Sequence, residues 1–207
     1  MITTLLFDFD GTIADTFSPV IQILNRLSPV YGYRPVKQRE IQRLRRLTMR
    51  ELLKEFHVPL GRVPFITRRA RAELVKDIPS LRLTAPLRGV LLALRKRGYR
   101  LGIVSSNSVE NVRAFLDRHH LDLFEFIYSC RGLLGKHHAL RTVLRRERLS
   151  RDEVLYIGDE VRDIDACRHV GIPIAAVSWG YNSSDILQKN QPDYLIKKPR
   201  DLLTVLL

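Results

Sequence analysis

The chain has 207 residues, 45% of them hydrophobic, and its 35 Lys and Arg against 22 Asp and Glu give a formal net charge of +13 at pH 7. This length suits one domain with an insertion, or two small ones, with enough apolar residues for a normal core. No apolar stretch approaches the roughly 20 residues that span a bilayer, and the amino terminus lacks the pattern of a secretion signal, so we expect no membrane partner and a cytoplasmic location.

The first predicted element is a buried strand over residues 3–7, where the chain is almost continuously apolar. The residues that follow it directly are Asp8, Phe9, Asp10, Gly11 and Thr12. Two carboxylates two positions apart at the carboxyl end of a strand, followed by a Gly that lets the backbone turn, indicate a site for phosphoryl chemistry.

Residues 16–82 are predicted to form a helical insertion. Ser18 and Pro19 are typical of a helix start, and residues 20–77 continue a helical pattern without a convincing strand. The insertion holds 15 Lys and Arg but only 5 Asp and Glu, so it carries +10 of the net charge. This surplus indicates either an anionic partner or a solvated basic face, and the sequence leaves both open.

From Pro86 onward, helical and strand patterns alternate regularly. Helices are expected over residues 86–97, 109–119, 137–147, 160–170 and 184–190 and at the carboxyl terminus, and strands over 100–105, 124–129, 153–157, 173–178 and 194–196. This alternation predicts an α/β fold, a doubly wound, Rossmann-like and mostly parallel sheet flanked by helices. Residues 1–15 and 83–207 would form the catalytic core and residues 16–82 a cap, with hinges near 15–16 and 79–86. Cys130 and Cys167 lack metal-ligand spacing and are expected to be reduced and buried.

Ligands of such sheets bind beyond the carboxyl ends of the strands, and three further motifs lie there. Ser105, Ser106 and Asn107 end one predicted strand, where hydroxyl and amide groups can hold a phosphate oxygen or, equally well, cap a helix. Lys136 opens a predicted helix, where its charge would reduce the repulsion between a carboxylate and a phosphoryl group.

The last motif is an acidic cluster after the strand at 153–157. It comprises Asp159, Glu160 and Asp163, with Arg162 among them. Carboxylates this close to Asp8 require a cation, and oxygen ligands with room for water suit Mg²⁺. We assign no catalytic role to Glu160 or Arg162. A negative charge such as that of Glu160 is favourable near the start of a helix, which accounts for this residue.

Together these motifs resemble those of the haloacid dehalogenase superfamily of phosphatases, in particular the phosphoglycolate-phosphatase-like branch with a small helical cap. The resemblance implies that Asp8 is the nucleophile and Asp10 the general acid and base. It implies phosphate binding by Ser105, Ser106, Asn107 and Lys136, and a Mg²⁺ site made by Asp8, the Asp10 carbonyl and Asp159. Thr12 and Asp163 would orient these groups without contacting the phosphate or the metal themselves.

The expected function is hydrolysis of a small anionic phosphate monoester through an aspartyl-phosphate, with phosphoglycolate as one possible substrate. The acid at position 10 disfavours carbon-halogen hydrolysis, because the dehalogenases of the superfamily lack it.

Two alternatives remain open: a phosphosugar mutase with the same core residues, and a nucleic-acid-binding or 3'-phosphatase module. No nucleic-acid motif supports the latter, and aromatic residues do not alternate with the arginines as base stacking requires. The sequence does not predict an oligomeric state.

Overall fold

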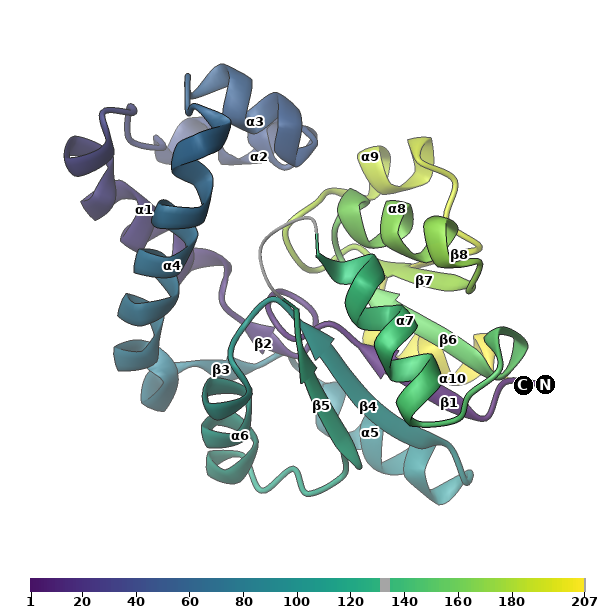
Figure 1. Cartoon of the computed structure of the whole chain (residues 1–207). Coiled ribbons are helices and arrows are strands. Elements are labelled where there is room, and N and C mark those ends of the chain that lie inside the picture. The colour runs from purple at the N-terminus through teal and green to yellow at the C-terminus, as the bar shows by residue number, and fades with distance from the viewer. Residues whose placement is uncertain (131–134, 207) are drawn as a thin grey trace.

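The computed structural model describes residues 1–130 and 135–206 and contains a six-stranded parallel sheet with helices on both faces (Figure 1). The strand order is β5-β4-β1-β6-β7-β8. The strands are β1 (Thr4–Phe7), β4 (Arg100–Ser105), β5 (Phe126–Ser129), β6 (Val154–Gly158), β7 (Ile174–Val177) and β8 (Tyr194–Ile196). The helices around them are α5 (Leu87–Lys96), α6 (Val109–Arg118), α7 (Lys136–Arg146), α8 (Val161–Val170), α9 (Ser184–Lys189) and α10 (Leu202–Val205). The predicted fold class is confirmed.

The central strand β1 is buried on both faces, which explains its continuous apolar sequence. Leu5 and Phe7 pack into a cluster with side chains of α5 and α6, whereas Leu6 packs into a second cluster with side chains of α7 and α8. Successive residues of a strand point to opposite faces, so one short run serves both layers. Cys130 and Cys167 are buried and free, as expected.

The helical insertion lies to the upper left of the sheet in Figure 1. Its helices are α1 (Phe17–Tyr31), α2 (Ile41–Leu44), α3 (Met49–Glu55) and α4 (Val63–Leu74), and its 3₁₀ turns are η1 (Gln38–Glu40), η2 (Leu60–Arg62) and η3 (Val75–Ser80). The first helix begins at Phe17, slightly earlier than predicted, because Pro19 is still within the first turn, where backbone N–H groups have no intrahelical partner. The division into cap and core stays a prediction.

Two short strands join the insertion to the sheet. β2 (Ala14–Asp15) and β3 (Arg82–Leu83) pair antiparallel, with Ala14 opposite Leu83. The sequence predicted only hinges here, because a two-residue strand is too short to show a pattern of alternation. The pairing brings the entry and the exit of the insertion together. Among the described residues, no helix has both the length and the apolar composition that a membrane span requires.

Candidate active site

The carboxyl edge of the sheet gathers buried polar side chains from four neighbouring segments. Asp8 follows β1, Asn107 follows β4, Lys136 begins α7 and Asp159 follows β6, and each is at most 2% exposed. Because β1 lies between β4 and β6, the ends of these strands converge on Asp8. Carboxylate oxygens of Asp8, Asp159 and Asp163 all lie within 4.8 Å of one another.

Lys136 bridges two of these carboxylates. Its Nζ donates hydrogen bonds to Asp8 Oδ2 at 2.6 Å and to Asp163 Oδ1 at 2.5 Å. Burial by itself lowers the pKa of Lys136, but Asp163 and Asp8 outweigh burial and hold that pKa above its ordinary value. The lysine is therefore charged, and it fixes the direction of the Asp8 side chain.

The three buried carboxylates exceed the charge of this one lysine by two. Burial raises the pKa of Asp8 above its ordinary value, and Asp163 adds to the rise while Lys136 opposes it. Burial also raises the pKa of Asp159 well above its ordinary value, with Glu160, Asp8 and Asp163 acting in the same direction. Carboxylates that repel one another in a buried site gain from a shared divalent cation, and oxygen donors suit Mg²⁺. The donor set therefore fits the predicted metal.

Asp159 is held by hydrogen bonds on both of its oxygens. The Thr12 hydroxyl donates to Oδ1 and the Tyr181 backbone N–H donates to Oδ2, both at 2.7 Å. A Cβ atom at Gly11 or at Gly180 would overlap this carboxylate, and Gly11 also has a φ of 78°. These two glycines allow the backbone to approach the carboxylate closely.

Asp10 has a different environment from Asp8. The Asn107 side-chain amide donates to both Asp10 oxygens, at 3.3 and 3.2 Å. Burial raises the pKa of Asp10 to about 6, and the charge of Asp8 contributes, while hydrogen bonds from Asn107 and Thr16 oppose the rise. A carboxyl group that titrates near neutral pH can both donate and accept a proton in one catalytic cycle.

The strand-end residues expected to bind phosphate have distinct surroundings. The Ser105 hydroxyl accepts the backbone N–H of Asn107 at 3.0 Å, and Ser106 lines a cavity between the insertion and the sheet. Asn107 directs its amide at Asp10, so the structure gives this residue a contact that the sequence analysis did not predict. Phosphate binding by these residues stays a prediction.

The cavity above Asp10 has a volume of about 290 Å³ and mostly apolar walls. Apolar side chains of α1, α2, α3 and α4 line most of it, and Asp10, Ser106 and Asn107 line the side formed by the core. Three cationic side chains also reach it: Arg45 and Arg71 from the insertion and Arg162 from α8. A ligand in this cavity would therefore contact both lobes of the molecule.

Comparison with known proteins identifies the family. A family model described as haloacid dehalogenase-like hydrolase matches residues 5–177. The chain belongs to the haloacid dehalogenase-like hydrolase family. The resemblance predicted from the motifs is confirmed, and the protein is an enzyme of the hydrolase class.

The relatives of this hydrolase are similar over nearly their full length. The chain is 36% identical to the phosphoglycolate phosphatase of Synechococcus elongatus, covering 96% of this chain and 94% of that protein. It is 26% identical to the pyrophosphatase PpaX of Anoxybacillus flavithermus, covering 99% and 97% of the two chains. The solved structure of a haloacid dehalogenase-like family hydrolase from Streptococcus pneumoniae superposes with a TM-score of 0.81 at 21% identity, covering 100% of this chain and 99% of that one.

In this hydrolase the insertion is docked onto the loop that holds Asp159. Arg45 donates through Nη2 to the carbonyl of Gly180 at 2.7 Å and through Nε to that of Tyr181 at 3.2 Å. In return, Asn182 Nδ2 donates to the carbonyls of Arg45 and Leu47 at 3.2 and 3.1 Å. The position of the insertion is thus coupled to the position of a candidate metal ligand.

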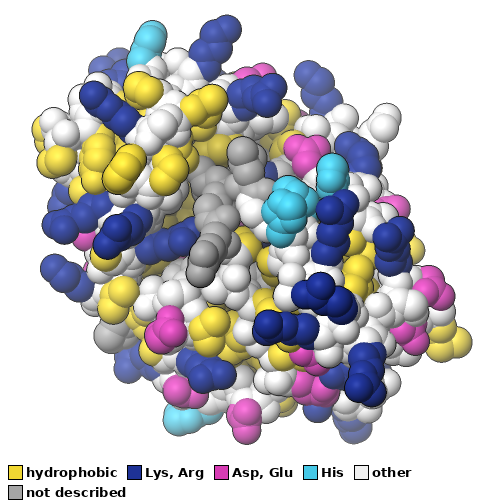
Figure 2. All heavy atoms as spheres, in the orientation of Figure 1, with side chains coloured by type: hydrophobic (Ala, Val, Ile, Leu, Met, Phe, Trp, Pro, Cys, Tyr) yellow, Lys and Arg dark blue, Asp and Glu magenta, His cyan; other side chains and the backbone are white. Residues whose placement is uncertain are grey.

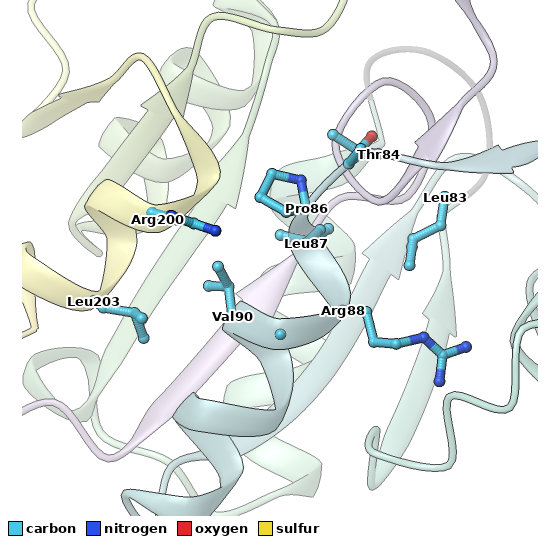
Figure 3. Close-up of a pocket in the computed structure, with 10 residues that line it drawn as sticks. Leu83, Thr84, Pro86, Leu87, Arg88, Val90, Arg200 and Leu203 are labelled. Atoms are coloured by element: carbon cyan, nitrogen blue, oxygen red, sulfur yellow. The ribbon is translucent and has the colours of Figure 1, made fainter.

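A second hollow, of about 560 Å³, lies at the exit of the insertion (Figure 3). Residues 83–90 line it together with Arg200 and Leu203. In the close-up, Arg88 points away from Arg200 and Val90. None of the candidate catalytic carboxylates lines this hollow, whereas Asp10 lines the first cavity.

The sequence analysis missed several residues of the site. Thr16, Tyr181 and Asn182 contact it through hydrogen bonds between segments far apart in the chain. Arg45 and Arg71 belong to a helical pattern in which basic residues recur throughout, so nothing in the sequence distinguishes them from their neighbours. Arg162 differs from these residues, because a basic residue inside the acidic motif is a signal in the sequence that it lies at the site.

Proposed function

We propose that the protein is a Mg²⁺-dependent phosphatase that hydrolyses a small phosphate monoester through an aspartyl-phosphate on Asp8, with phosphoglycolate as the leading substrate. The observation that carries the proposal is the pairing of Asp8 with Lys136 inside a buried cluster of carboxylates. The similarity to a phosphoglycolate phosphatase, at 36% identity over nearly the whole chain, supports the choice of substrate.

In the first step, an Asp8 oxygen attacks the phosphorus atom and the bond from phosphorus to the ester oxygen breaks. Asp10 donates its proton to the departing oxygen, a role for which a pKa of about 6 is well placed. In the second step, Asp10 accepts a proton from the water that attacks the phosphorylated Asp8, which releases phosphate and restores the carboxylate.

Lys136 keeps the Asp8 oxygens aligned for attack, and its charge offsets the repulsion between the carboxylate and the incoming phosphoryl group. The predicted ligands Asp8, Asp159 and the Asp10 carbonyl would hold Mg²⁺, which supplies further neutralisation of phosphoryl charge. Asp163 holds Lys136 in place and accepts the N–H of Glu160 at 3.1 Å, so it orients the lysine. Residues 16–82 would act as the cap that excludes water.

The test is phosphate release in the presence of Mg²⁺ from a panel of phosphoglycolate, pyrophosphate, sugar phosphates, nucleotides and a 3'-phosphorylated oligonucleotide. We expect phosphoglycolate to be preferred and the Asp8→Asn variant to release none. Mass spectrometry of the quenched enzyme should locate the phosphoryl group on Asp8. An isomerised sugar phosphate without released phosphate would indicate a mutase, and preference for the oligonucleotide would indicate a nucleic-acid phosphatase.

Lys and Arg are spread over both lobes on the face shown in Figure 2 and are not gathered in a single tract. On this face, the distribution favours a small anionic substrate over a nucleic-acid strand, since strand binding uses a continuous basic groove.

A further inference from the structure

Arg71 is a cation of the active-site cavity that has no hydrogen-bond or ion-pair partner among the residues that the structure describes. It belongs to α4, is partly buried, and lines the same cavity as Asp10, Ser106 and Asn107. Within residues 1–130 and 135–206 it makes no hydrogen bond and no ion pair. The other arginines of the insertion that have partners contact carboxylates or carbonyls: Arg26, Arg34, Arg43 and Arg69 pair with glutamates, Arg46 pairs with Asp185, and Arg45 and Arg62 donate to backbone oxygens.

The surroundings of Arg71 favour an anion. Burial lowers the pKa of Arg71, and the neighbouring Arg162 lowers it further, while Cys130 and Asp10 oppose this. Its guanidinium is therefore partly desolvated, and neighbouring negative groups offset only part of that cost, so an anion that paired with it would stabilise it.

The charged neighbours of Arg71 are already engaged. Arg162 forms an ion pair with Glu160 within its own helix start. Asp10 accepts from Asn107 on both of its oxygens. Arg71 thus lines a cavity in which the nearby acids have other partners, and its guanidinium carries five N–H donors.

We propose that Arg71 binds a second anionic group, such as a carboxylate, on the leaving portion of the substrate and thereby determines specificity. The proposal rests on the function proposed above. Asp10 would protonate the leaving oxygen, and Arg71 lines the same cavity, so a group that contacts the arginine belongs to the part of the substrate that departs. The cavity of about 290 Å³ limits this part to a small group. The substrate class is then a phosphate ester or anhydride with a second charge close to the scissile bond.

The test compares substrates with and without that charge. For wild type, Arg71→Gln and Arg71→Lys, kcat/KM is measured for phosphoglycolate, for pyrophosphate and for ethyl phosphate, which lacks the second anion. The Arg71→Gln change should lower the ratio of phosphoglycolate to ethyl phosphate by about tenfold or more, mainly through KM, because hydrogen bonds to charged groups contribute that much. Lysine should restore part of the ratio. Pyrophosphate shows whether the arginine accepts phosphate as well as carboxylate.

Arg68→Gln is the matched control, because Arg68 is an exposed arginine on the same helix. It should leave the ratio unchanged. An equal loss of kcat/KM for all three substrates in Arg71→Gln, or no loss at all, would overturn the proposal.

A binding measurement separates this inference from the proposed function. With Mg²⁺ present, calorimetry of phosphoglycolate with Asp8→Asn should give at least about tenfold tighter binding than with Asp8→Asn/Arg71→Gln. This result would support Arg71 even if no substrate were turned over by the wild type. Equal affinity of the two proteins, or binding by neither, would contradict the role of Arg71.

Discussion

Replacement of Asp159 by asparagine should make the metal-free protein more stable and insensitive to Mg²⁺. Asparagine keeps the shape of the side chain, so its Oδ1 can still accept the Tyr181 N–H and its Nδ2 can donate to the Thr12 hydroxyl. The main change is therefore the loss of one buried negative charge.

The magnitude follows from the spacing of the carboxylates. Oxygens of Asp159, Asp8 and Asp163 lie within 4.8 Å of one another, and at an effective dielectric of 20 each such pair repels by about 3 kcal/mol. Glu160 also repels Asp159, but its ion pair with Arg162 offsets that charge, and the charge of Lys136 cancels about one of the other two repulsions, which leaves about 3 kcal/mol. For a chain of this size that difference corresponds to a Tm increase of about 6–12 °C in the variant.

The sign of the pH dependence follows from the pKa of Asp159, which burial and then the acidic neighbours raise above its ordinary value. A raised pKa means that the protonated form is favoured in the folded state. Its stabilising contribution is complete below the ordinary pKa of 3.8 and is lost as pH rises through the folded pKa. The advantage of the variant should therefore be largest at neutral pH and vanish in acid.

The assay is thermal unfolding of both proteins in EDTA and in excess MgCl₂. At a Mg²⁺ concentration of about 100 times Kd, the wild type should gain about 2.7 kcal/mol, or about 5–11 °C, while the variant gains little. A variant that melts below the wild type in EDTA and keeps the full Mg²⁺ shift would refute the reasoning. Such a result would mean that Asp159 is neither repelled by the other carboxylates nor required for Mg²⁺ binding.

Asp8→Asn should lose turnover and keep the fold, because the amide cannot form the acyl phosphate; wild-type activity in a correctly folded variant would rule out the nucleophile. For alkyl phosphates, kcat/KM should fall about tenfold per pH unit above the Asp10 pKa of about 6, since the proton donor is lost, and Asp10→Asn should abolish this limb of the profile. Asp10→Asn should accumulate phosphoenzyme only with good leaving groups, which mass spectrometry can detect. Lys136→Met should lose turnover and about 3–5 kcal/mol of stability in urea unfolding, because Asp8 and Asp163 lose their buried partner. An unchanged urea midpoint would show that the ion pairs contribute nothing to the fold.

The succession of strands along the chain and the residues at their ends could be predicted from the sequence. Asp8, Asp10, Lys136 and Asp159 follow or precede elements with strong periodicity, and in a parallel sheet the carboxyl ends of neighbouring strands share one edge. A residue that directly follows a strand of such a sheet is therefore expected at the edge where the site forms. The helices of the insertion could also be predicted, since the helical pattern continues over many turns.

The tertiary structure alone decided which residues of the insertion reach the site and what they contact. Arg45 and the carbonyl of Gly180 are 135 positions apart, and nothing local to either residue indicates their hydrogen bond. Arg71 and Arg68 look alike in the sequence, and only the docking of α4 over Asp10 directs one of them into the cavity and leaves the other in solvent. Periodicity determines the faces of an element, whereas the contacts between two lobes depend on how those faces pack together, and that packing is a property of the whole folded chain.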